Sequence, residues 1–108
     1  MNDVVIGTGQ LVGKGVYASR DFQKDEIVIQ YTLRSLTEAE FDELPDSEKI
    51  FTHRHHGIMQ LYSEPERYVN HSTTPNTYQD LLNQRDVALR KIKKGEAITT
   101  DASMDDAA

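Results

Sequence analysis

The most distinctive stretch of this 108-residue chain reads Arg67-Tyr68-Val69-Asn70-His71-Ser72-Thr73-Thr74-Pro75-Asn76. Two asparagines, a histidine and a proline lie within seven residues, and these residue types hydrogen-bond readily to the backbone or to a ligand. Taken alone, the stretch favours an ordinary polar turn. Its significance depends on the segments that surround it.

The composition of the whole chain limits the possible classes of protein. Hydrophobic residues make up 37% and charged residues 28%, which indicates one small soluble globular domain. The net charge of −6 argues against nucleic acid or an anionic membrane as a partner and favours a basic protein or peptide. Without cysteine, a leader or a long apolar stretch, we expect an intracellular protein, in the cytoplasm or, in a eukaryote, the nucleus.

Short β-branched runs separated by turn residues predict a mostly β fold. The predicted strands comprise residues 4–6, 15–18, 27–31, 57–62, 86–89 and 97–100. Glycines and polar residues between these runs predict hairpin turns.

Helix signals are confined to two places. Thr37 and Glu40 form a capping box that predicts a helix over residues 37–44, ended by Pro45, with an apolar stripe that we expect to lie against the sheet. Pro65 suits the first position of a second, single helical turn that would end before the Asn-His-Ser segment.

Closely spaced glycines near the start allow a second interpretation. Gly7, Gly9, Gly13 and Gly15 could bring backbone amides close to a phosphate. The dinucleotide-binding fingerprint, however, needs a glycine where Val12 stands. A glycine-rich hairpin turn therefore has about equal weight with a ligand-binding loop.

A histidine cluster raises the question of a metal. On a strand, His53 and His55 would share a face, as two metal ligands do. No third ligand is visible in the sequence. We therefore expect no metal and keep a metal protein only as a minor hypothesis.

Two further segments accompany the stretch at 67–76. They read Gly13-Lys14-Gly15-Val16-Tyr17-Ala18 and Ile92-Lys93-Lys94-Gly95-Glu96-Ala97-Ile98-Thr99. In order and spacing, the three segments resemble the SET-domain family of protein lysine methyltransferases. They are similar to its G-x-G opening, its R-F-x-N-H-S-x-x-P-N signature and its I-x-x-G-E-E-I/L-T strand, with Asp25 where a glycine is usual.

The resemblance implies a mostly β, SET-domain (β-clip-like) fold of short antiparallel strands with one or two short helices. The Asn-His-Ser segment would form a knot-like site. A single SET-like domain would span residues 1–108, with a variable insert at about 32–56 and a disordered tail at 103–108.

The resemblance also implies an S-adenosylmethionine-dependent protein-lysine N-methyltransferase. The implied cofactor-binding residues are Lys14, Gly15, Val16, Arg67, Asn70 and His71. The aromatic residues from which a substrate channel could be built are Tyr17, Tyr31, Phe51, Tyr68 and Tyr78. Such a channel needs to favour the neutral amine of the substrate lysine, whose ordinary pKa is about 10.4.

One departure supports an alternative function. Ala102 stands where the family usually has a tyrosine beside the transferring methyl group, so no catalytic residue can be assigned there. Phe51 likewise stands about where another channel tyrosine is often found. The alternative is a catalytically impaired SET-fold binding module.

An acidic segment lies inside the expected variable insert. Residues 37–48 hold six acidic residues and no basic residue. A solvated helix surface explains this pattern, and a dock for a Lys- or Arg-rich peptide is the functional interpretation. A homodimer is a further hypothesis, because so short a chain leaves apolar surface to cover.

Overall fold

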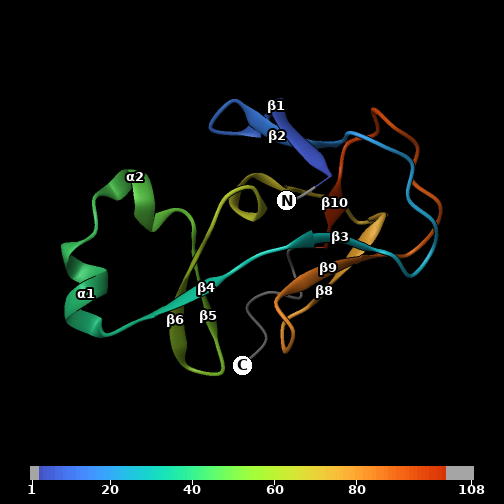
Figure 1. Ribbon diagram of the computed structural model, residues 1–108. Helices are drawn as coiled ribbons and strands as arrows, with labels where there is room; N and C mark the ends of the chain where they lie inside the picture. The colour runs from blue at the N-terminus through green and yellow to red at the C-terminus, as the bar shows by residue number, and fades with distance from the viewer. Residues whose placement is uncertain (1–2, 102–108) are drawn as a thin grey trace.

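The computed structural model describes residues 3–101 and confirms that the fold is mostly β (Figure 1). The strands are β1 Val4–Leu11, β2 Lys14–Ala18, β3 Ile27–Gln30, β4 Leu33–Leu36, β5 Thr52–His55, β6 Ile58–Tyr62, β7 Asn70–His71, β8 Thr77–Asp80, β9 Arg85–Ala88 and β10 Thr99–Thr100. The helices are α1 Glu38–Glu43, α2 Asp46–Lys49 and the 3-10 helix η1 Glu66–Tyr68. No helix among these residues is long and apolar enough to cross a membrane.

Three small antiparallel sheets and one parallel strand pair make up this fold. The antiparallel sheets have the strand orders β1-β2, β3-β9-β8 and β4-β6-β5. In the parallel pair, β7 lies beside β10, so that Asn70 is opposite Thr99 and His71 is opposite Thr100. Parallel strands need a long crossover connection. The chain between β7 and β10 contains β8 and β9, and this crossover brings the 67–76 stretch beside β10.

Asn76 holds this crossover in place. Its buried side-chain amide donates from Nδ2 to the carbonyl of Ala97 at 2.8 Å and accepts at Oδ1 from the amide of Thr99 at 2.9 Å. The hydroxyl of the next residue, Thr77, donates to the carbonyl of Thr99 at 2.8 Å. The Pro-Asn end of the stretch thus acts as an extra pairing partner for β10.

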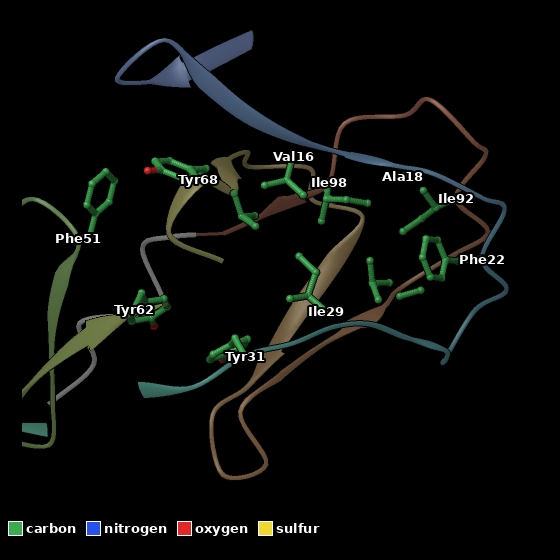
Figure 2. Close-up of a cluster of buried hydrophobic side chains, with 13 residues drawn as sticks. Val16, Ala18, Phe22, Ile29, Tyr31, Phe51, Tyr62, Tyr68, Ile92 and Ile98 are labelled. Atoms are coloured by element: carbon green, nitrogen blue, oxygen red, sulfur yellow. The ribbon is translucent and has the colours of Figure 1, made fainter. Parts of the chain in front are cut away.

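The buried core has an aliphatic and an aromatic part, both visible in Figure 2. Val16, Ile29, Ile92 and Ile98 are fully buried and form most of the aliphatic part, and the fully buried Phe22 belongs to the same core cluster. Burying each of these side chains contributes about 1.5–3 kcal/mol. The aromatic part consists of Tyr31, Phe51, Tyr62 and Tyr68.

Helix α1 forms where the capping box predicts it. The amide of Glu40 donates to Oγ1 of Thr37 at 3.1 Å, and the amide of Thr37 donates to Oε1 of Glu40 at 3.0 Å. The expectation that this helix lies against the sheet is wrong, because none of its residues is buried. With only six residues, most of them acidic or small, α1 offers no broad apolar face. Phe41 alone is half-buried, beside a groove at the end of the β4-β6-β5 sheet.

The predicted strands do not include β4, β5, β7 or β8. Of these, β4, β5 and β8 lie at the edges of three-stranded sheets, and β7 pairs only with β10 in the described residues. Their conformation comes from pairing with β6, β9 and β10, which is a long-range effect. The helical turn predicted after Pro65 is present as η1.

Candidate active site

Strands β2 and β7 approach each other closely at Gly15 and Asn70. A Cβ atom on the buried Gly15 would lie 3.1 Å from Nδ2 of Asn70, so glycine is what permits this approach. Asn70 is 9% exposed, and its Oδ1 has no hydrogen-bond donor within residues 3–101. A buried acceptor without a donor costs free energy unless a ligand supplies one. The pair therefore marks a candidate binding point.

The two neighbours of Gly15 have different surroundings. Lys14 is exposed, and its Nζ lies 4.8 Å from the centroid of the Tyr68 ring, in a cation–π contact. Val16 is fully buried, and its carbonyl accepts a hydrogen bond from the amide of Ile98 at 2.8 Å. Lys14 can therefore face a ligand, whereas the Val16 side chain belongs to the core.

A pocket of about 140 Å³ lies where the 67–76 stretch meets β10. Its lining residues come from five strands, η1 and the end of α2: Ile50, Phe51, His53, Tyr62, Glu66, Arg67, Val69, His71, Gln79 and Thr100. Pockets for drug-sized ligands usually exceed about 300 Å³. This pocket is of a size that suits one extended side chain.

Of the five aromatic residues proposed for a channel, Phe51 lines this pocket, and Tyr68 and Tyr31 pack against residues that line it. Phe51 and Tyr68 pack edge to face with ring centroids 5.3 Å apart. Tyr31 stacks on Tyr62 with ring centroids 5.7 Å apart (Figure 2). Phe51 and Tyr62 both line the pocket, so each of the two aromatic pairs contributes one ring to it.

The other two aromatic candidates lie apart from this cluster. The hydroxyl of Tyr17 donates to the carbonyl of Thr8 on the β1–β2 hairpin. Tyr78 is 46% exposed and lines a separate, mainly apolar pocket with Leu81 and Leu89. Neither side chain lines the pocket beside Phe51.

Arg67 and His71, both proposed to bind the cofactor, line the aromatic pocket. Nε of Arg67 donates to the carbonyl of Tyr62 at 2.9 Å, and its guanidinium lies 4.9 Å from the centroid of the Phe51 ring. Nδ1 of His71 lies 3.7 Å from a carboxylate oxygen of Asp101. The six proposed cofactor residues thus fall into two groups, one around Gly15 and one along the pocket.

Tyr62 is a pocket residue that the sequence analysis misses. Its hydroxyl and that of Tyr31 each lie 3.0 Å from Oε1 of Gln79. Because an amide oxygen only accepts, both hydroxyls donate to it, and Nε2 of His55, 3.0 Å from the Tyr62 hydroxyl, is then the donor to Tyr62. The position of Tyr62, at the end of a predicted strand and five residues before Arg67, is the only sequence signal for this role.

Two buried carboxyl groups were also missed. Glu66 is 3% exposed and Asp86 is fully buried. Burial raises the pKa of Asp86 to about 7, and its interaction with Glu66 opposes this rise. An aspartate beside Val87 and Ala88 in a predicted strand is a sequence signal that could have revealed Asp86, since aspartate is a poor strand former.

Two sequence hypotheses concern metal binding and the missing tyrosine. His53 and His55 stack at 6.2 Å, but residues 3–101 contain no group of three His, Cys, Asp or Glu side chains arranged to hold a metal ion. Ala102 and the tail at 103–108 lie outside the described residues.

Relatives of this chain include proteins named histone-lysine N-methyltransferases. The chain is 29% identical to histone-lysine N-methyltransferase trr of Drosophila melanogaster and to human histone-lysine N-methyltransferase 2D, over 96% of its length in each case. It is 32% identical, over 86% of its length, to the H3 lysine-36-specific enzyme of Saccharomyces cerevisiae. It spans only 5%, 2% and 15% of the lengths of these relatives.

Solved structures with the same fold include two from different organisms. A candidate histone methyltransferase of Plasmodium falciparum superimposes with a TM-score of 0.69 at 21% identity, covering 94% of this chain and 93% of the other. Polycomb Repressive Complex 2 of Chaetomium thermophilum, bound to S-adenosylmethionine, gives a TM-score of 0.70 at 23% identity, covering 99% of this chain and 16% of the other. These likenesses confirm the fold.

The family model of the SET domain matches residues 13–101. The matched region contains all three segments that the fold brings together, from Gly15 on β2 through Asn70 on β7 to Thr99 on β10. Because the match covers most of the chain, the chain belongs to the SET-domain family.

Proposed function

We propose that this chain binds S-adenosylmethionine beside Gly15 and Asn70 and transfers its methyl group to a lysine of a basic protein. The observation that carries the proposal is the buried Oδ1 of Asn70, an acceptor without a donor, held against Gly15. Relatives named histone-lysine N-methyltransferases and a structural neighbour bound to S-adenosylmethionine support the same cofactor and reaction.

The residues around Gly15 fit the amino-acid part of this cofactor. Its ammonium group is a donor that suits Oδ1 of Asn70, and its carboxylate suits the exposed ammonium of Lys14. Gly15 leaves room for the ligand at this position, because a Cβ on residue 15 would also lie 3.3 Å from the carbonyl oxygen of Thr8. The proposed fit therefore rests on the match between hydrogen-bond donors and acceptors and on the space that Gly15 leaves for the cofactor.

The pocket supplies what a substrate lysine requires. When bound, S-adenosylmethionine supplies an electrophilic methyl group on a positively charged sulfur. Phe51, Tyr62 and Tyr68 would exclude water from the amine, which lowers its pKa, and would hold it in line for attack. Positioning of this kind can supply much of the rate acceleration without a metal.

The acidic segment at 37–48 supports a basic protein or peptide as substrate. A groove of about 340 Å³ lies between α1 and the β5–β6 hairpin. Leu36, Phe41, Ile58 and Met59 give it an apolar floor, and Glu38 and Asp42 give it two carboxylates. Charge complementarity favours a segment that contains both Lys or Arg and apolar side chains.

Calorimetric titration with S-adenosylmethionine tests cofactor binding. We expect saturable one-to-one binding that weakens at least roughly tenfold in Asn70→Ala, because the buried acceptor is lost. Asn83→Ala is the matched control, since Asn83 is an exposed turn residue bonded to Asp80, and we expect it to bind normally. Absence of binding at millimolar cofactor, or equal binding by both variants, would contradict the proposed site.

Transfer of a labelled methyl group to a library of lysine-containing basic peptides tests the reaction. Label in the N-methyl-lysine of peptides, and none in peptides with arginine in place of lysine, is the expected result. Cofactor binding without transfer to any peptide would instead favour the alternative function, a catalytically impaired SET-fold binding module.

A further inference from the structure

Two carboxyl groups lie buried beneath the candidate pocket. Glu66, on η1, lines the pocket, and Asp86 lies on β9 directly opposite Gln79 of β8. Side chains of opposed residues lie on the same face of a sheet. Asp86 is therefore on the face from which Gln79 reaches the hydroxyls of Tyr31 and Tyr62. Glu66 therefore lies at the pocket, and Asp86 is buried behind the Gln79 side of it.

The carboxyl of Asp86 is buried next to that of Glu66. Neither carboxylate oxygen of Asp86 receives a hydrogen bond from a donor within residues 3–101, and the group that it interacts with is the carboxyl of Glu66. Two adjacent buried carboxylates cannot both be charged without a large cost in free energy. Burial accordingly raises the pKa of Asp86 to about 7. A carboxyl group with this pKa gains or loses its proton near neutral pH.

The nearby cations have partners other than the two buried carboxyl groups. Arg67 contacts the carboxylate of Glu48 and the carbonyl of Tyr62, and Lys14 lies over the ring of Tyr68. The polar end of the pocket therefore presents oxygen atoms, among them the carboxyl of Glu66. An ammonium group is the ligand that suits such a surface.

We propose that Glu66 accepts the proton of the ammonium group when a lysine side chain enters this pocket. The inference rests on the proposed function and adds a proton acceptor to it. One N–H bond of the ammonium breaks, its electron pair remains on nitrogen, and the proton forms an O–H bond with the carboxylate of Glu66. Asp86 is a positioning residue that sets the basicity of Glu66 through their shared proton.

Other ionisable groups around the pocket are less suited to this step. Besides tyrosine hydroxyls, the groups that line the pocket or pack on its elements are Lys14, Glu48, His53, His55, Arg67 and His71. Nε2 of His55 is engaged with Tyr62, and His71 is exposed beside Asp101. His53 packs edge-on against the Tyr62 ring, with centroids 4.9 Å apart.

The pH dependence of methyl transfer tests the proposal, with the best acceptor peptide of the library and saturating cofactor. We expect Glu66→Gln to lower the rate at neutral pH at least roughly tenfold. We also expect its rate to rise towards high pH, where lysine loses its proton to solvent. Glu64→Gln is the matched control, because Glu64 is exposed in the same segment, and its profile should equal that of the unmodified chain.

Asp86→Asn provides a second, independent variant. Removing the neighbouring acid lowers the pKa of Glu66, so the rise in rate with pH should begin at lower pH than in the unmodified chain. Thermal melting and cofactor affinity are measured on each variant, so that a folding defect is recognised. A Glu66→Gln variant that folds, binds cofactor and keeps the unmodified pH profile would overturn the inference and leave the proposed function intact.

A measurement without cofactor separates the two proposals. The side-chain carboxyl carbons are followed by NMR as n-butylamine, which has the length of a lysine side chain, is added. We expect the titrating resonance of Glu66 to move in the direction of protonation, and the response to be absent in Glu66→Gln. Unchanged carboxyl resonances would overturn the inference, whereas a chain that binds no S-adenosylmethionine would overturn only the proposed function.

Discussion

Nη1 of Arg67 lies 3.0 Å and 3.2 Å from the two carboxylate oxygens of Glu48, and this contact joins the Arg-Tyr-Val-Asn-His-Ser segment to α2. The arginine is largely buried, whereas about a third of the Glu48 side chain is exposed. The same guanidinium also binds the carbonyl of Tyr62 and packs on Phe51. Arg67 therefore connects three elements around the candidate pocket.

We expect Arg67→Ala to lower the free energy of unfolding by about 2 kcal/mol, because a hydrogen-bonded charged group and its ring contact are lost together. Glu48→Gln should cost less than about 1 kcal/mol, since Glu48 is partly screened by solvent. Urea denaturation of both variants measures the difference. Equal losses would show that the ion pair, and not the contacts with Tyr62 and Phe51, dominates.

Asn76→Ala is expected to be more severe, with a loss of about 2–4 kcal/mol. The substitution leaves the amide of Thr99 and the carbonyl of Ala97 without their partners beside the core. It also removes the side-chain hydrogen bonds that tie the β7–β10 crossover to the segment around β10. Thermal melting compared with Asn83→Ala, in the exposed turn, measures the effect, and similar melting temperatures for the two variants would contradict this assignment.

Gly15→Ala tests the approach of β2 to β7. The new methyl group would lie 3.1 Å from Nδ2 of Asn70 and 3.3 Å from Cα of Gly9, so the Asn70 amide has to move. We expect the affinity for S-adenosylmethionine to fall at least roughly tenfold, with a smaller change in stability. Calorimetry and melting on the same sample measure both quantities. An unchanged affinity in a folded variant would argue against Gly15 as part of the cofactor site.

Asp86→Asn tests the pH dependence of stability. The pKa of Asp86 is raised from 3.8 to about 7 in the folded chain, so between those values the folded state binds more protons than the unfolded state. The contribution of Asp86 to stability therefore falls as pH rises through this window. Each pKa unit corresponds to about 1.4 kcal/mol, so the loss amounts to a few kcal/mol.

The asparagine variant should lack this loss and be more stable than the unmodified chain at about pH 8. The difference in the free energy of unfolding between the two proteins, measured from about pH 4 to about pH 8, isolates the contribution of Asp86 from that of the exposed carboxyls. A difference that does not change with pH would mean that Asp86 titrates normally.

Much of the site was predictable from motifs, and the rest depended on long-range contacts. The capping box at Thr37 and the turn after Pro65 follow from local residue types, and the family resemblance implies a knot-like site at the Asn-His-Ser segment. The pairing of this segment with β10 is seen only in the structure. Glu66 carries no local signal, and the only signal for Tyr62 is its position at the end of a predicted strand, five residues before Arg67. Their positions at the pocket depend on which strands pair with β6 and which elements cover η1.

Residue types at fixed spacing are enough to predict that the chain is rich in strands and to which family it belongs, because both depend on local composition and on the order of three motifs. Only the tertiary structure decided that Glu66 and Asp86 are buried as a pair and that Tyr17 and Tyr78 lie away from the pocket. Burial and contact depend on which segments the fold stacks over each residue. An aspartate within a predicted strand marks Asp86 as unusual, but no pattern within a few residues of it identifies Glu66 as its partner.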